Sequence, residues 1–365
     1  MGFKCGIVGL PNVGKSTIFN AITNAGAEAA NYPFCTIDPN VGVVSVPDIR
    51  MEKIVASYKP RAIIPTVTHF VDIAGLVKGA SQGEGLGNQF LTHIRECEAI
   101  MQVVRCFEDD NIVHVHNTVD PLRDVEIIET ELLLKDLDSV EKKLIVEAKN
   151  ARVGTPAAKL KLNACETLKE EITKGISARD LIGKDEYIDE LIQDLALLTA
   201  KPIFYCANVN EDDVLTGNSY VEQLQAHAQK TGSEVLVLCG KIEEELSALE
   251  PEEKQEFLNE LGLPSSGLDA VIQKGYSLLG LRTYFTAGEK EVRAWTFEAG
   301  WKAPACAGVI HSDFERGFIR AETLSFADFE KAGSWNAAKE LGLVRTEGKE
   351  YEVQDGDILY FLFNV

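Results

Sequence analysis

The stretch Gly9-Leu-Pro-Asn-Val-Gly-Lys-Ser16 constrains the fold of this chain more than any other feature of its sequence. It matches the phosphate-binding loop pattern G-x-x-x-x-G-K-[S/T] at every defined position. The apolar run at residues 5–8 precedes it and predicts a buried strand, and a helical pattern begins at Ser16. In this setting the backbone N–H groups of the loop surround phosphate oxygens, and the positive end of the helix dipole faces them. The stretch therefore predicts a nucleotide-binding α/β domain.

Side chains of this loop have distinct expected roles. We expect Lys15 to neutralise the β- and γ-phosphates and so to assist catalysis, and the Ser16 hydroxyl to hold Mg²⁺. The loop and the first helical turn together supply the expected phosphate contacts, from Asn12, Val13, Gly14, Lys15, Ser16 and Thr17.

The composition limits the choice of partners. Among 365 residues, 57 are acidic and 36 are basic, which gives a net charge of -21. Such a charge argues against non-specific binding to bare DNA, because that binding depends on neutralising phosphates, and we expect no specific DNA partner. The length predicts two or three domains.

The cysteines and the N-terminal residues bear on the compartment. Eight cysteines are scattered without a C-x-x-C pair, which favours a reduced, cytoplasmic setting over a disulfide framework. The first residues run directly into the predicted strand, so we expect no signal peptide. No apolar stretch approaches the roughly 20 residues of a membrane span, so we expect no membrane partner.

The order of elements predicts a doubly wound α/β domain. Strand-like segments at residues 3–8, 66–71, 100–106, 202–207 and 234–238 alternate with helical patterns. Several of these strands are apolar without alternation, as expected for strands that are buried on both faces of a parallel sheet. We assign residues 1–125 and 200–279 to this domain.

Residues 126–199 form a different unit, which is charged and favours helix. Leu133, Leu137, Val140 and Leu144 have the spacing of one helix face. The turn-forming residues 153–156 interrupt the pattern, and it resumes from Leu162. We expect an antiparallel helical hairpin that is inserted into the sheet domain.

Residues 280–365 predict a small β-plus-helix domain. The segment at 292–297 is strand-like, 326–340 is helical, and a turn at Gly356-Asp357 leads into a terminal strand at 358–365.

Two further segments predict the metal and γ-phosphate contacts. Asp72-Ile-Ala-Gly75 ends a predicted strand, as a D-x-x-G element does. We expect Asp72 to approach Mg²⁺ and the Gly75 N–H to meet the γ-phosphate. Thr36, in the turn-rich loop at 31–39, is expected to close over Mg²⁺ in the triphosphate state.

The segment Asn208-Val-Asn-Glu211 predicts the base that is bound. A guanine reader has N-K-x-D here, and its Asp accepts hydrogen bonds from guanine N1–H and the 2-amino group. This chain has Val209 and Glu211 instead, whereas Asn208 can still pair with adenine N6 and N7. We expect the backbone at Cys239 and Gly240 to flank the base. The segment therefore favours ATP over GTP.

Together these motifs resemble the YchF/Obg-like ATPase family, a branch of the Obg-related translation-factor GTPases. The resemblance covers essentially the whole chain and rests on GLPNVGKST at 9–17, NYPFCTIDPN at 31–40, DIAGLVKGAS at 72–81, NVNE at 208–211 and DFERGFIRAE at 313–322. It implies Mg²⁺-dependent ATP hydrolysis, association with the ribosome, a coiled-coil insertion and a C-terminal TGS domain of β-grasp type.

The residue that positions the attacking water is left open by the sequence. Leu76 stands where many GTPases place a water-orienting Gln, and it can form no hydrogen bond. The resemblance implies His114, and His116 beside it is a decoy on the same strand face. Lys78 or Ser81 is another candidate. Asn12 resembles the asparagine of relatives that recruit K⁺, which makes K⁺ a second candidate cofactor.

The hairpin tip carries charge opposite to that of the whole chain. Between residues 141 and 161, two acidic residues accompany Lys142, Lys143, Lys149, Arg152, Lys159 and Lys161. A basic tip on an acidic protein is typical of selective contact with RNA, here ribosomal RNA, although charged helix faces are also common. An ATPase that acts as a switch on the ribosome is the first hypothesis. A GTPase translation factor and an ATP-gated ribosome-binding adaptor with incidental turnover are the alternatives.

Overall fold

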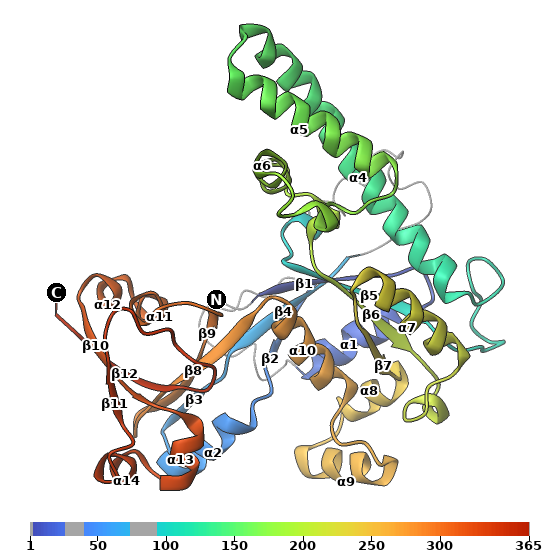
Figure 1. The fold of residues 1–365 in the computed structure, drawn as a ribbon. Helices are drawn as coiled ribbons and strands as arrows, with labels where there is room; N and C mark the ends of the chain where they lie inside the picture. The colour runs from blue at the N-terminus through green and yellow to red at the C-terminus, as the bar shows by residue number, and fades with distance from the viewer. Residues whose placement is uncertain (1–2, 26–39, 74–92, 365) are drawn as a thin grey trace.

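A computed structural model describes residues 3–25, 40–73 and 93–364 (Figure 1). Within these residues, the larger unit is built on a sheet with the strand order β2-β4-β1-β5-β6-β7. All its neighbouring strands are parallel except β2 and β4. The strands are β1 Lys4–Val8, β2 Val41–Ser45, β4 Val67–Asp72, β5 Ala99–Arg105, β6 Ile203–Asn208 and β7 Val235–Leu238. The expected doubly wound sheet is confirmed.

Helices cover this sheet because its central strands are apolar on both sides. Every residue of β5 and β6 is buried. Helix α7 (Ser219–Thr231) packs on the first part of α4 (Pro121–Asn150) and on β6 and β7. Helices α1 (Lys15–Ala25) and α8 (Gly240–Leu246) pack on each other, and α10 (Gly267–Leu278) contacts β5 and β7. The phosphate loop thus lies at the carboxyl end of β1, where ligands bind in folds of this kind.

The inserted hairpin projects from the sheet domain (Figure 1). It consists of α4 and α5 (Pro156–Thr173), which are joined by a short turn at Ala151–Val153. Val140 is buried against Cys165 and Leu168, and Leu133 and Leu137 pack beside them. Helix α6 (Glu186–Asp194) completes this separate core. The predicted hairpin is confirmed, although α4 begins at Pro121, and its first turns belong to the core of the sheet domain.

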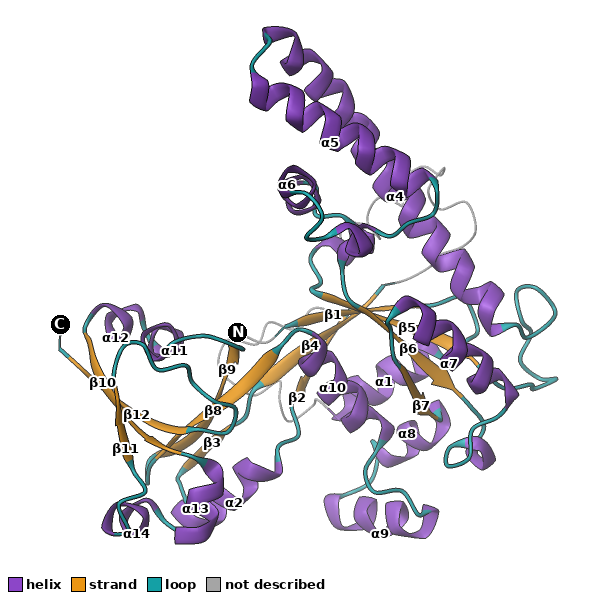
Figure 2. Cartoon of the chain, viewed as in Figure 1, coloured by secondary structure: helices purple, strands orange, loops and turns teal. Residues whose placement is uncertain are grey.

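A second sheet forms the C-terminal unit, with the order β11-β10-β12-β8-β9-β3 (Figure 2). The strands are β3 Ala62–Ile64, β8 Leu281–Ala287, β9 Glu291–Glu298, β10 Phe318–Leu324, β11 Arg345–Glu347 and β12 Ile358–Phe363. Helices from the same part of the chain accompany them, namely α11 (Ala303–Ile310), α12 (Ser312–Arg316), α13 (Phe326–Ala332) and α14 (Trp335–Glu340).

The structure corrects two sequence-based expectations for the C-terminal unit, its boundary and one of its helices. Strand β3 pairs with β9, and α2 (Ile49–Tyr58) buries Met51 and Ile54 in the core of this unit, so part of the expected 1–125 segment belongs here. The helix expected at 326–340 is divided, because Gly333 has φ 75° and ends α13 before α14 begins. Helix α9 (Pro251–Leu261) packs in a small separate cluster with residues of α8. No helix of the described residues has the length and hydropathy needed to cross a membrane.

Candidate nucleotide-binding site

The phosphate loop adopts a tight turn that requires particular residues. Asn12 has φ 63° and Gly14 has φ 92°, both in the left-handed region. Gly14 is required for a second reason, since a Cβ atom there would collide with the Nδ2 atom of Asn208. Helix α1 starts directly after it at Lys15. The loop N–H groups therefore precede a helix N-terminus, which is the arrangement that binds phosphate.

Lys15 and Asp72 meet although they are 57 positions apart. The Lys15 Nζ atom forms an ion pair with Oδ1 of Asp72. Neighbouring parallel strands bring them together, since Ile7 of β1 lies opposite Asp72 of β4. The phosphate-binding lysine and the carboxylate expected at the metal thus lie together, next to Ser16. A phosphate loop of this kind acts with a divalent metal ion. Phosphates and water supply most of the ligands of that ion.

A cavity of about 700 Å³ connects the phosphate loop with the base-reading segments. This volume lies in the range of small-molecule sites. Of the expected residues, its lining includes Asn12, Gly14, Lys15, Ser16, Thr17, Asn208, Val209, Cys239 and Gly240. Val13 does not line it, because its side chain is buried in the core. Burial raises the pKa of the Cys239 thiol, so this group stays protonated and uncharged at the cavity wall.

Asn208 braces two loops in the structure, a role that the sequence did not predict. Its side chain is buried, and Nδ2 donates to the Val13 carbonyl at 3.0 Å. Its Oδ1 accepts from the Gly240 N–H at 2.9 Å. The amide is therefore engaged by the phosphate loop on one side and by the start of α8 on the other. The expected contact between Asn208 and adenine stays a prediction, and it must use the remaining hydrogen-bonding capacity of the amide.

The structure shows the surroundings of the two residues, Val209 and Glu211, that differ from the guanine-binding motif N-K-x-D. Val209 is only 2% exposed and follows β6 directly. The Glu211 Oε1 atom accepts a hydrogen bond from Lys241 Nζ at 2.6 Å, at the rim of the cavity. This bond raises the pKa of Lys241. The carboxylate of Glu211 thus already binds a cation, which does not favour a second role as acceptor for the N–H groups of guanine.

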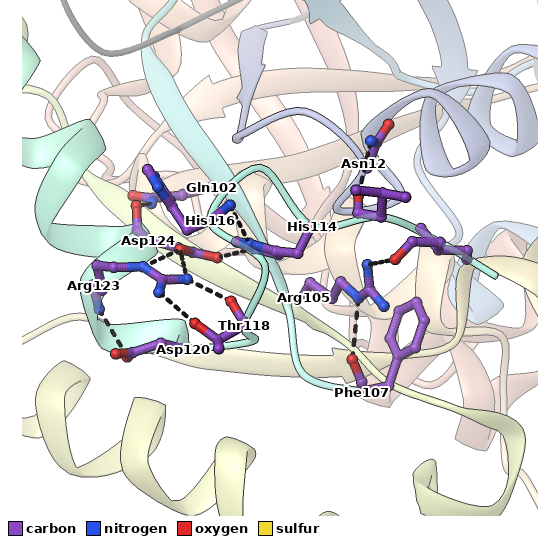
Figure 3. Close-up of polar contacts among 12 residues, drawn as sticks. Asn12, Gln102, Arg105, Phe107, His114, His116, Thr118, Asp120, Arg123 and Asp124 are labelled. Carbon is purple, nitrogen blue, oxygen red and sulfur yellow. Dashed lines mark hydrogen bonds and ion pairs between the residues drawn. The ribbon is translucent and has the colours of Figure 1, made fainter. Parts of the chain in front are cut away.

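His114 does not line the cavity, contrary to its expected catalytic position. It is 5% exposed, and its Nε2 atom lies 2.8 Å from Oδ2 of the buried Asp124 (Figure 3). Its Nδ1 atom accepts from the His116 N–H at 3.1 Å, so Nε2 carries the proton toward Asp124. Arg123 binds the other oxygen of the same carboxylate. A buried acidic partner therefore holds this histidine at the first turn of α4.

Asn12 links the phosphate loop to the segment that carries His114. Its Nδ2 atom donates to the carbonyl of Val113 at 2.9 Å. The amide oxygen of Asn12 has no such bond among the described contacts, and it is the atom that a K⁺ ion would use.

Several residues that line the cavity were missed by the sequence analysis. Phe107, Asp109 and Ile112 belong to the loop after β5. None of them belongs to a motif. Their position was nevertheless open to prediction, because the carboxyl ends of parallel strands meet at one edge of the sheet.

Other expected site residues fall outside the described part of the chain. They are Thr36, Gly75, Leu76, Lys78 and Ser81. In the part that is described, no group of three or more His, Cys, Asp or Glu residues has the geometry of a metal site.

Comparisons with known proteins identify both ends of the chain. Residues 4–148 match a family model described as 50S ribosome-binding GTPase. Residues 281–364 match the model YchF-GTPase_C, described as a protein of unknown function (DUF933). The ribosome-binding ATPase YchF of Bacillus subtilis strain 168 is 56% identical, and that of Escherichia coli O157:H7 is 54% identical, each over 100% of both chains.

Solved structures agree with these matches. The Schizosaccharomyces pombe YchF GTPase is 41% identical, with a TM-score of 0.88 over 99% of this chain and 98% of that one. A GTP-binding protein from Pyrococcus horikoshii OT3 has a TM-score of 0.63 over 99% of this chain and 100% of that one; at 23% identity it supports the fold alone.

Proposed function

Because the chain belongs to the YchF family, we propose that it is an ATPase that associates with the ribosome as a nucleotide-dependent switch. It binds and hydrolyses ATP with Mg²⁺ and uses GTP less well. Because it associates with the ribosome, we propose that it acts in the cytoplasm.

The observation that carries this proposal is one cavity with two kinds of wall. The phosphate loop and Lys15 form the first wall, and the Lys15–Asp72 ion pair joins to it the carboxylate that is proposed to bind the metal. Asn208 and Gly240 form the second wall, where the base is expected. Since Asn208 bonds to both loops, phosphate binding and base binding are held in a fixed relation.

The residues of the first wall fit a Mg²⁺–triphosphate. Lys15 would bind the β- and γ-phosphates, and Ser16 and Asp72 would hold the metal directly or through water. When bound, Mg²⁺ neutralises charge on the β- and γ-oxygens. We further propose that Thr36 and Gly75, which lie outside the described residues, complete the metal and γ-phosphate contacts.

His114 stays the proposed residue for the attacking water, with a condition that the structure adds. It is buried against Asp124 and does not line the cavity, so we propose that this bond breaks when the imidazole moves to the γ-phosphate. A K⁺ ion held by the amide oxygen of Asn12 is the proposed second source of charge stabilisation.

The rival function is GTP hydrolysis, which the name of the S. pombe relative favours. Val209 and the Glu211–Lys241 ion pair oppose it in this chain. Equilibrium competition between labelled ATP and unlabelled ATP or GTP separates the two functions. Stronger competition by GTP would show that the base assignment is wrong.

The ribosome-binding part of the proposal is supported by three exposed cations at the hairpin tip. Lys149, Arg152 and Lys159 form no ion pair among the described contacts, whereas Lys142 and Lys161 are neutralised by Asp138 and Glu190. Turnover measured with and without ribosomal subunits tests the switch against an adaptor. A switch is stimulated by its partner, and an adaptor with incidental turnover is not.

A further inference from the structure

The loop after β5 forms part of the cavity wall and starts beside the base-reading segment. Phe107, Asp109 and Ile112 of this loop line the cavity. The Cys106 N–H donates to the Asn208 carbonyl at 2.8 Å, so this wall begins directly beside the end of β6. A side chain of the loop near its start can therefore contact the nucleoside part of a nucleotide, whereas the far end of the loop, at Val113, meets the phosphate loop through Asn12.

Arg105 lies within the curve of this loop and bonds to it at several points (Figure 3). It is the last residue of β5, and it is 1% exposed. Its Nε donates to the Phe107 carbonyl at 3.1 Å, one terminal nitrogen donates to the Ile112 carbonyl at 2.9 Å, and the other donates to the Asp109 carbonyl at 3.2 Å. The guanidinium carbon also lies 4.7 Å from the centre of the Phe107 ring. The three carbonyls belong to the same three residues that line the cavity.

The charge of Arg105 is balanced in an unusual way. Among the described residues, no carboxylate forms an ion pair with it, and its guanidinium contacts the three carbonyls and the Phe107 ring instead. A buried cation is costly unless all its donors are satisfied. Only arginine has a planar set of donors that reaches several carbonyls at once, and a lysine ammonium is a compact point charge.

The far end of the loop is fixed independently of Arg105. Asn12 holds the Val113 carbonyl, and Asp124 holds His114. The segment between Phe107 and Ile112 thus spans two anchored ends, and Arg105 holds three of its carbonyls, in addition to the bonds that Asp109 forms within the loop. Loss of Arg105 should change this wall and leave the phosphate loop in place.

We infer that Arg105 is a positioning residue that shapes the nucleoside side of the cavity through Phe107, Asp109 and Ile112. The inference rests on the proposed function, that this cavity binds ATP. Arg105 lies outside every nucleotide motif. On this inference it contributes to the affinity for the nucleoside and not to the affinity for the phosphates.

The test compares two ligands on the full-length protein, Mg-ATP and Mg-tripolyphosphate, by competition with a fluorescent nucleotide. Arg105→Met should weaken ATP binding by about tenfold or more and change tripolyphosphate binding by less than about twofold. The ATP affinity of Arg105→Lys should lie between those of the unmodified protein and Arg105→Met, since lysine keeps the charge and part of the hydrogen bonding. Arg50→Met is the matched control: Arg50 pairs with Asp48 and Asp355, away from the cavity lining, so both affinities should stay unchanged.

The outcomes are distinct. Equal losses for ATP and tripolyphosphate would show general damage to the site and overturn the inference, as would unchanged ATP affinity. If Arg105→Met does not fold, Arg105→Lys decides, with an expected loss of about threefold for ATP alone. If the unmodified protein binds no ATP, the proposed function itself fails, and the inference fails with it.

Discussion

Asn208→Ala tests whether the buried asparagine braces two loops or reads the base. The substitution leaves the Val13 carbonyl and the Gly240 N–H without their partner in a site where Asn208 is 4% exposed. Each buried polar group left unpaired costs about 1–3 kcal/mol, so the free energy of unfolding should fall by about 2–6 kcal/mol for the two groups. Urea unfolding followed by circular dichroism measures this change, with the midpoint and the slope both recorded.

The same variant has an expected pattern of ligand binding. Because the phosphate loop loses its support, affinities for Mg-ATP and Mg-tripolyphosphate should fall together. Each 1.4 kcal/mol of binding free energy that is lost lowers an affinity by about tenfold. Asn208→Asp is the matched variant, since it keeps the acceptor for Gly240 but sets an oxygen against the Val13 carbonyl; it should be destabilised as well. Unchanged stability together with a loss for ATP alone would refute the brace and show that Asn208 reads the base.

Three further predictions concern the base, the catalytic water and the partner. Val209→Lys combined with Glu211→Asp should shift the ratio of ATP to GTP affinity toward GTP by about tenfold or more, because a bidentate pair with guanine becomes available; an unchanged ratio in equilibrium titration would count against the base assignment. His114→Ala should lower turnover by about tenfold or more and change ATP affinity little, since a group that positions water acts mainly in the transition state. If the variant keeps full turnover, with and without ribosomes, the role of His114 is limited to its structural bond with Asp124. Replacing Lys149, Arg152 and Lys159 with Ser should weaken ribosome co-sedimentation and flatten its salt dependence, because each lost phosphate contact removes roughly one released counterion; Lys174→Ser, whose lysine is already paired with Glu170 and Glu171, is the control, and equal behaviour of the two would exclude the tip.

The parts of the fold that local sequence determines were predictable. The phosphate loop fixes its own geometry through Gly14 and the helix that follows, and apolar runs mark β5 and β6. The hairpin followed from the spacing of Leu133, Leu137 and Val140, because a helix with one apolar face must bury that face against a partner.

The parts that depend on distant partners were not predictable. Strand β3 has three residues, and it exists because it pairs with β9, more than 200 positions later. The path of the loop after β5 depends on Arg105, whose three acceptors are backbone carbonyls with no sequence signature. His114 was placed at the cavity by resemblance alone, and no local pattern indicated its bond to Asp124.

Hydrolysis of an equimolar mixture of ATP and GTP by the unmodified protein tests the central claim most directly. Both nucleotides are followed in the same Mg²⁺-containing reaction, with and without ribosomal subunits, and Lys15→Ala serves as the blank. We predict that ATP is consumed before GTP, that ribosomal subunits accelerate its consumption, and that the blank is inactive. Preferential consumption of GTP, or equal activity of the Lys15→Ala protein, would contradict the assignment of this cavity to ATP hydrolysis.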